Sequence, residues 1–328
     1  WEVQELLKYI LKRLVEILPT LFVVALITFF VTRIIPGDPA SVMLGPQASV
    51  EAVEKMRVKL GLNESIPKQF LIYMNDILHG NFGTSFYYNE PVTLLILERF
   101  PNTVILAAAS MILALLVGIP IGVISATKQY SIFDYVTMVL ALIGVSMPIF
   151  WLGLMMVLTF SVNLGWLPST GMGSMSKGIM DVIKHLILPS VCLATIPAAM
   201  FARITRSSML DIIRQDYIKT ARAKGLRESV VIWKHAFKNA LPPIITVVGI
   251  ELASLLSGAI LTETIFSWPG MGKMVVDAIE KRDYGLVQGS VLFIALIYVI
   301  TNLIVDILYA VVNPRIRYTK TSERGGGA

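Results

Sequence analysis

The chain has 328 residues, of which 55% are hydrophobic and only 15% charged, and its mean hydropathy is +0.72. A soluble domain carries about 25% charged residues, so this composition excludes an ordinary soluble protein and indicates a polytopic helical membrane protein. The formal net charge of +6 does not call for nucleic acid as a partner, because no basic motif interleaved with aromatic residues accompanies it.

Six apolar segments are long enough to cross a bilayer, which takes about 20 helical residues. They are 12–34, 102–127, 133–162, 184–206, 241–262 and 287–312. The fourth contains Pro189 and Pro197, and proline is tolerated in a membrane helix where neighbouring helices satisfy the freed backbone groups. We therefore expect an all-α membrane protein of six transmembrane helices, with the fourth kinked and packed inside the bundle.

Two spans contain glycine or proline residues of the kind that interrupt a helix or let helices pack closely. The second has Gly118 and Gly122, and the third has Gly144 followed by Ser146, Met147 and Pro148. Close helix packing through small residues explains both patterns. The alternative is a hinge that lines a pathway, and on that reading Ser146, Met147 and Pro148 are pathway-lining candidates.

Six spans place both termini on one side of the membrane. Basic residues gather before the first span, after the second, between the fourth and fifth, and after the sixth, and all these segments fall on the same face. Basic loops mark the cytoplasmic side. The sequence therefore predicts a cell-membrane protein, embedded in the lipid bilayer, with both termini in the cytoplasm.

Residues 35–98 lie on the opposite face and are long enough for a small subdomain. Ser49 has the character of an N-cap, Gly61 of a stop, and a second short helix is expected from Pro67 to just before Gly80. Two amphipathic helices of this kind could pack on the outer mouth of the bundle. Their role is either structural or the binding of an external partner.

No catalytic or metal-binding constellation stands out. The sequence "SWPGMGKM", from Ser267 to Met274, lacks the first glycine and the Ser/Thr of a phosphate loop. We expect a tight turn there, beside Trp268 as a membrane-interface anchor. We expect this chain to bind no cofactor itself and any ATP to be bound by another chain.

Ionisable residues inside spans are functional candidates by default, since they are costly in a bilayer. Glu251 lies within the fifth span and Asp306 within the sixth, whereas Arg33 and Glu263 lie at span ends, at headgroup level. Glu251 fits an interhelical hydrogen bond, a pathway-lining polar site or a proton-coupled carboxylate. The last possibility would mean an ion-driven carrier.

The polar segment between the fourth and fifth spans is unusual. Tyr217 to Lys224 is predicted as a short helix with Tyr217 and Ala221 on one face. Ala221, Ala223 and Gly225 are small, so another protein could approach the backbone closely, and Gly225 ends the helix at little cost with φ > 0.

A second helix is expected at about 228–240. Its apolar stripe would be Val230, Trp233, Phe237 and Ala240, and Pro242 would end it. Two short helices in an L suit a groove on a soluble partner. A helix lying on the lipid surface is the alternative.

Several stretches together resemble the permeases of ABC importers in the oligopeptide/dipeptide/nickel group, over nearly the whole chain. They are "RIIPGDPA" (33–40), the external stretch 60–86, "DYIKTARAKGL" with "HAFKNALPP" (216–243), "ETIFSWPGMGKMVVDAI" (263–279) and "DILYAVVNPRIRY" (306–318). The general importer loop has Glu-Ala-Ala, then three residues, then Gly. Here Lys219, Thr220 and Ala221 precede Gly225, so only Ala221 and Gly225 match.

The resemblance implies a type I importer permease fold with a small helical extracytoplasmic insert. The N-terminal cytoplasmic segment and the first span would be residues 1–34, and the extracytoplasmic insert residues 35–98. The permease core would be residues 99–313, with a coupling loop at 207–240. Residues 314–328 would be a partly disordered cytoplasmic tail. The partners implied are a homologous second permease, two ATP-binding subunits that carry ATP and Mg, and an extracytoplasmic substrate-binding protein. The cargo implied is a dipeptide or oligopeptide, with nickel or oligosaccharides as alternatives.

The resemblance also assigns roles to residues. Contact with the ATPase subunits would fall to Tyr217, Thr220, Ala221, Ala223, Lys224 and Gly225, and the pathway would be lined by Ser146, Met147, Pro148 and Glu251. We predict that Gly225→Glu or Ala221→Glu abolishes coupling while folding survives.

Overall fold

The computed structural model describes residues 2–34, 38–45, 47–257 and 259–312. Across these residues the secondary structure is helical, and the β-type pairing is an isolated bridge between Thr84 and Pro91. Five helices are long and apolar enough to cross a membrane, and a bent pair of helices makes a sixth if it is counted as one span. The predicted all-α membrane fold is confirmed, while the tail 314–328 lies outside the described residues.

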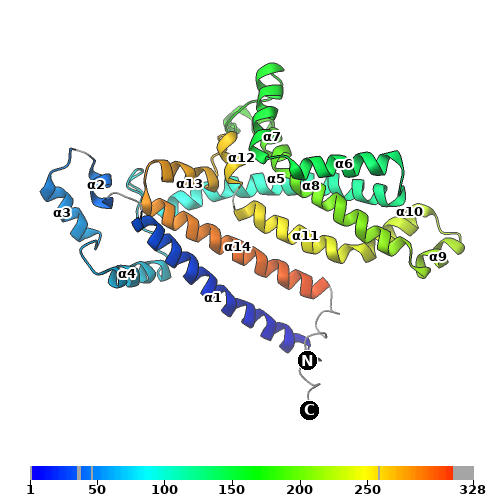
Figure 1. The fold of residues 1–328 in the computed structure, drawn as a ribbon, viewed down its shortest axis with the longest axis horizontal. Helices are drawn as coiled ribbons and strands as arrows, with labels where there is room; N and C mark the ends of the chain where they lie inside the picture. Colours follow the sequence, from blue (N-terminus) through cyan, green and yellow to red (C-terminus); the bar gives the residue numbers. More distant parts are fainter. Residues whose placement is uncertain (1, 35–37, 46, 258, 313–328) are drawn as a thin grey trace, which may run out of the picture.

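Five long helices build the bundle (Figure 1). They are α1 (Glu2–Ile34), α5 (Val92–Thr127), α8 (Ile179–Ile213), α11 (Lys238–Ser257) and α14 (Tyr284–Val312). The short helix α9 (Asp216–Ala223) lies at one end of the bundle, and α2 (Pro39–Leu44) and α3 (Val50–Lys59) lie at the opposite end. We call these the loop end and the insert end.

The centre of the bundle is the contact between α5 and α8. A Cβ atom at Gly118 would lie 2.5 Å from the Ala198 carbonyl oxygen, and one at Gly122 would lie 2.6 Å from that of Ala202. Only glycine permits so close an approach, so close packing is the correct interpretation of this pair. α8 is the most buried candidate span, as expected.

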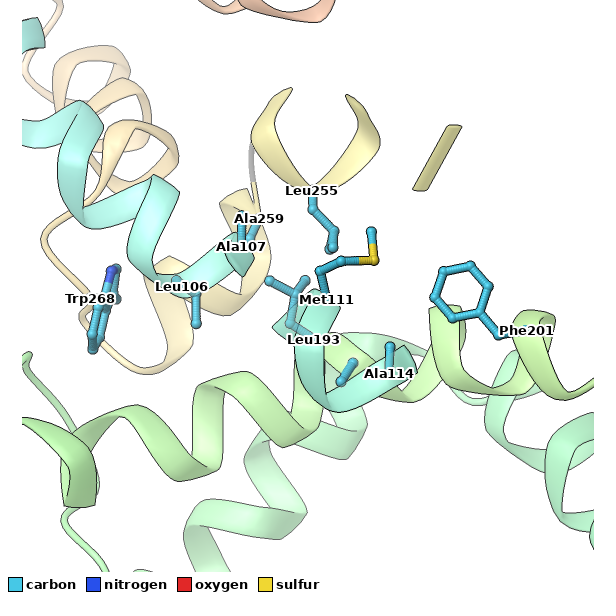
Figure 2. Packing of buried hydrophobic residues seen from close by; sticks show 10 residues of the cluster. Leu106, Ala107, Met111, Ala114, Leu193, Phe201, Leu255, Ala259 and Trp268 are labelled. Carbon is cyan, nitrogen blue, oxygen red and sulfur yellow. The ribbon is translucent and has the colours of Figure 1, made fainter. Parts of the chain in front are cut away.

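Apolar side chains from three helices and the chain after α11 fill the core beside this contact. Figure 2 shows Met111 of α5 close to Leu255 of α11 and Leu193 of α8. The α5 helix begins ten residues before the predicted start at 102 and continues through Pro101. The second span is therefore longer than its apolar stretch.

The third predicted span is not one continuous helix. It is divided into α6 (Ile132–Ser146) and α7 (Ile149–Met156), which continues as the π-helix η1 (Val157–Asn163), and the two parts are bent by 103°. Met147 has extended backbone angles, as steric contact with a following proline favours. Figure 1 shows α7 directed away from the bundle. The chain is therefore bent at this second breaker, and Gly144 also packs against Thr195 of α8.

The fifth span also differs from the prediction. One helix runs from Glu228 to Ser257 through α10 (Glu228–Val230), the π-helix η3 (Val231–Phe237) and α11. Pro242 does not end it, since Pro242 and Pro243 both lie inside α11. The helix ends at Ser257, and the short helix α12 (Ile260–Ile265) follows.

Hydrogen bonds that the sequence did not predict join α12 and the turn after it to α5. Glu263 of α12 is fully buried, and its carboxylate accepts hydrogen bonds from the Thr103 hydroxyl at 2.8 Å and the Lys273 amide at 3.1 Å. Trp268 is also fully buried, and its indole N–H donates to the Asn102 carbonyl at 2.8 Å. Together they fasten α5 to α12 and to α13 (Met271–Glu280).

The insert has three short helices, of which α2 was not predicted. Ser49 caps α3 through the Ala52 amide, and Gly61 follows it with φ +68°, both as expected. No residue of α3 is buried, so the expected packing on the bundle does not extend to this helix.

The third helix, α4 (Ile66–Leu78), packs on α1. Its Phe70 and Tyr73 rings lie 5.1 and 5.6 Å from the Phe29 ring of α1, and Arg33 donates hydrogen bonds of 3.0 and 2.9 Å to the Gln69 side chain. In Figure 1, α1 is the outermost helix beside α14. The end of the insert is attached elsewhere, because Phe82 packs beside α5, α13 and α14 and the buried Ser85 hydroxyl donates to the Asp283 carboxylate.

Candidate functional site

The helix α9 is seated on the loop end of the bundle by its apolar side. Ile218 is fully buried and Ala221 is 8% exposed. They belong to an apolar cluster with residues of α5, α8 and the helix that begins at Glu228: Val123, Ala126, Met209, Val231, Ala236 and Ala240. Burial of a side chain the size of Ile contributes roughly 1.5–3 kcal/mol, so α9 is bound firmly to three long helices.

The opposite side of α9 is open. Tyr217 is 44% exposed, and Thr220, Ala223, Lys224 and Gly225 are exposed as well. Ala221 does not share this surface, although the sequence placed it on one face with Tyr217. An Ala221→Glu change would therefore disturb the packing beneath α9, contrary to the expectation that folding survives it.

Gly225 ends α9 as predicted. Its φ is +75°, and its amide donates to the Arg222 carbonyl at 2.9 Å. No heavy atom lies within 4 Å of a Cβ built at this position. Within this chain, glycine is needed here for its backbone conformation and not for lack of space.

An ion pair across the corner was missed by sequence reasoning. The Arg222 guanidinium donates to both carboxylate oxygens of Glu228, at 2.7 Å and 3.2 Å, and so joins the end of α9 to the start of the next helix. The only signal is a pair of opposite charges flanking Gly225, six residues apart. On the exposed side, the Lys219 ammonium hydrogen-bonded to Asp216 lowers the pKa of that carboxyl below its ordinary value.

The predicted stripe on the second helix is mostly wrong. Val231, Ala236 and Ala240 are its buried residues, and the step of five from Val231 to Ala236 fits the π-helical turns of η3. Trp233 is 48% exposed, and its ring stacks edge-on against Phe237 with centroids 5.3 Å apart. The indole is therefore half-exposed and does not belong to the buried stripe.

The predicted pathway residues occupy two separate hollows. Ser146, Met147 and Pro148 line an open hollow of about 450 Å³ at the bend between α6 and α7. Glu251 lines a second one of about 250 Å³, between α7, α8, α11 and α12. Ile149, directly after the bend, belongs to the second hollow, so the two adjoin the same bend without forming one pocket.

The two span acids differ in their surroundings. Asp306 forms an ion pair of 3.1 Å with Arg13, which joins α14 to α1. Glu251 is half-buried, and its hollow contains no second charged side chain. Among the described residues, no group of three or more His, Cys, Asp or Glu side chains could hold a metal ion.

The bundle, the bent third span and the polar helix seated on three spans define a multi-span membrane permease. The chain belongs to the family of binding-protein-dependent transport system inner membrane components, whose model matches residues 118–318. The family model for the N-terminal part of such membrane components matches residues 6–107.

Individual relatives match along almost the whole chain. The dipeptide transport system permease protein DppB of Alkalihalophilus pseudofirmus is 45% identical, with 95% of this chain and 100% of the relative covered. DppB of Escherichia coli K12 is 43% identical over 96% of this chain and all of the relative. The glutathione transport system permease protein GsiC of Salmonella choleraesuis is 42% identical over 95% of this chain and all of the relative.

A solved structure shares the fold. It is a chain of the MetNI methionine ABC transporter in an inward-facing conformation, with a TM-score of 0.55 and 18% sequence identity. The match covers 67% of this chain and 97% of that chain. At this identity the comparison supports the importer permease fold alone.

Proposed function

We propose that this chain is the permease subunit of an ATP-driven importer that carries dipeptides or short oligopeptides into the cell. The observation that carries the proposal is the seating of α9. Ile218 fixes the helix to three long helices, while its opposite side, with Tyr217, is open to a partner. A helix bound in this way can transmit the movement of a soluble subunit to the bundle.

In this proposal the loop end lies in the cytoplasm, in line with the basic residues gathered there. Two ATP-binding subunits, which hold ATP and Mg, receive α9 in a cleft and contact Tyr217, Thr220, Ala223, Lys224 and Gly225. A homologous second permease completes the pathway, and an extracytoplasmic binding protein delivers cargo near the insert.

Dipeptides are the cargo that we favour, because relatives 43–45% identical over their full length carry the name of dipeptide systems. The glutathione system at 42% identity indicates that related chains serve other small peptides. The bend at Ser146–Pro148 and the hollow around Glu251 are the pathway-lining sites of this proposal, since a carboxylate within a span is placed there at a cost.

The first test is purification of the tagged chain from its native membrane in mild detergent, with mass spectrometry of what accompanies it. We expect a second permease and one or two ATPases. Recovery of the chain alone would contradict the proposal.

The second test is uptake of a labelled dipeptide into proteoliposomes that hold the whole complex. Uptake should require ATP and the binding protein, and Gly225→Glu should abolish it while the complex still assembles. Glu251→Gln should have the smaller effect. Uptake that survives without the ATPases but is abolished by a protonophore would instead indicate an ion-driven carrier.

A further inference from the structure

The helix α6 has few apolar attachments to the bundle. Within it, only Asp134 and Ala141 are buried, and most of its large apolar side chains are exposed, among them Ile132, Phe133, Val136, Val139, Leu140 and Ile143. Near its C-terminal end it contacts α8 through a small residue, with Gly144 against Thr195. What fixes the position of α6 at the loop end is therefore a polar contact.

That contact is a carboxylate held from three directions. Asp134, whose side chain is only 2% exposed, accepts a hydrogen bond from Arg206 Nε at 2.6 Å on Oδ1 and one from Arg206 Nη2 at 2.7 Å on Oδ2. The Ser125 hydroxyl of α5 donates to Oδ1 of the same carboxylate, and the Tyr130 amide donates to Oδ2 at 3.0 Å. We call Asp134, Arg206 and Ser125 the clamp.

The geometry of the clamp suits it to fixing the position of α6 rather than to raising the stability of the fold. Replacing a buried ion pair by apolar residues is often neutral or stabilising, because desolvation offsets the attraction between the charges. A planar guanidinium bound to both oxygens of a carboxylate, in contrast, fixes distance and orientation. The pair thus holds α6 in one register against α8.

The clamp lies between the two sites described above. Arg206 precedes the last residue of α8, Ile213, by seven residues, or about 10 Å along the helix. From there the chain turns directly into α9, whose Ile218 packs in one cluster with Met209 of α8. In the other direction, α6 runs from Asp134 to the bend at Met147 and Pro148.

We propose that Asp134 and Arg206 are positioning residues that couple α9 to the bent third span. When α9 moves with the ATPase subunits, the end of α8 moves with it, and the clamp obliges α6 to follow, which displaces the bend. Without the clamp, α8 moves while α6 stays behind. This inference rests on the proposed function.

The test compares Asp134→Asn and Arg206→Lys with wild type in the complete complex, reconstituted with its binding protein. Asp134→Asn should lower the number of peptides taken up per ATP hydrolysed at least about tenfold, while assembly and ATP hydrolysis persist. Arg206→Lys, which keeps the charge but loses the two-pronged geometry, should give a smaller loss of the same kind. An unchanged ratio in Asp134→Asn, or a parallel loss of uptake, hydrolysis and thermal stability, would overturn the proposal.

The matched control is Asp306→Asn. It removes an ion pair that also joins two long helices, with Arg13, but that does not involve α6, α8 or α9. Its uptake per ATP should stay within about twofold of wild type. An equal fall in uptake per ATP in this control would show that this ratio responds to the loss of any ion pair. That result would overturn the role assigned to the clamp.

A second measurement tests the clamp even if the reconstituted complex transports no peptide. A spin label at Val139, an exposed residue of α6, is placed in the chain with Cys192→Ala and read by electron paramagnetic resonance. Asp134→Asn should increase the mobility of the label and Asp306→Asn should not. Equal mobility in all three proteins would overturn the clamp, whereas failure of wild type to transport would count against the proposed function alone.

Discussion

The two polar regions outside the spans are built in different ways, although both consist of short helices. At the loop end, α9 places Ile218 in a cluster shared with three long helices. At the insert end, α3 buries nothing, and α4 reaches the bundle through aromatic contacts with α1. A helix that packs in a cluster with several others can pass a displacement on to them, whereas α4 contacts the bundle through α1. We therefore expect changes in α9 to affect coupling more than changes in α4.

The largest expected effect comes from Ile218→Ala at the loop end. Truncation of a fully buried side chain costs about 2–5 kcal/mol of packing free energy, so α9 should loosen from the bundle. We expect uptake to fall at least about tenfold, which a coupling loss of 1.4 kcal/mol already produces, and amide exchange over 216–224 to accelerate. Leu71→Ala, an exposed residue of α4, is the control and should change neither. Equal losses in both would remove the contrast between the regions.

Gly225→Val and Gly80→Val compare the loop end with the insert end directly, because the two glycines have nearly the same backbone φ angle. Their φ values are +75° and +74°, and neither has an atom within 4 Å of the added Cβ. Each change should cost about 1–2 kcal/mol of backbone strain. Only Gly225→Val should lower ATP-driven uptake, though by less than Ile218→Ala, because in the proposed function only that corner meets the ATPase subunits. Full uptake by Gly225→Val would show that the corner is not a contact.

Tyr217→Ala tests the exposed side of α9 without touching its packing. Tyrosine is enriched among the residues that dominate interfaces, where truncation costs about 2 kcal/mol or more. We expect weaker association of the ATPase subunits, measured by titration in detergent, and an unchanged thermal midpoint. Leu78→Ala, on exposed α4 surface, should leave the association as it is. A lowered thermal midpoint in Tyr217→Ala would place this side chain in the packing instead.

The smallest effect on uptake is expected from Phe70→Ala in the insert. It removes ring contacts with Phe22 and Phe29 of α1, each worth about 0.5–1.5 kcal/mol beyond area. Amide exchange over 66–78 should accelerate, while uptake falls no more than about threefold and the ATPases stay bound. Complete loss of uptake would mean that the insert is as essential to coupling as α9.

The sequence by itself determined the features that depend on local chemistry. Apolar length identified the membrane helices, because a bilayer requires about 20 apolar residues whatever the fold. The Ser49 cap and the positive φ at Gly61 and Gly225 followed from single residues whose backbone preferences need no tertiary contact. The polar helix at 216–223 was likewise visible in advance.

Only the tertiary structure decided which face of each helix is covered. Ala221 is buried because α9 turns that side toward the cluster with Ile218 and Met209. Trp233 is exposed because η3 is π-helical, which shifts the buried spacing away from the pattern assumed for an α-helix. The burial of Glu263 and Trp268 involves hydrogen-bond partners that lie some 160 residues away in the chain. No local sequence pattern carries information over that separation. The clamp of Asp134 with Arg206 joins residues 72 apart for the same reason. A charge within a span predicts that some partner exists, but only the packing of three helices determines which one.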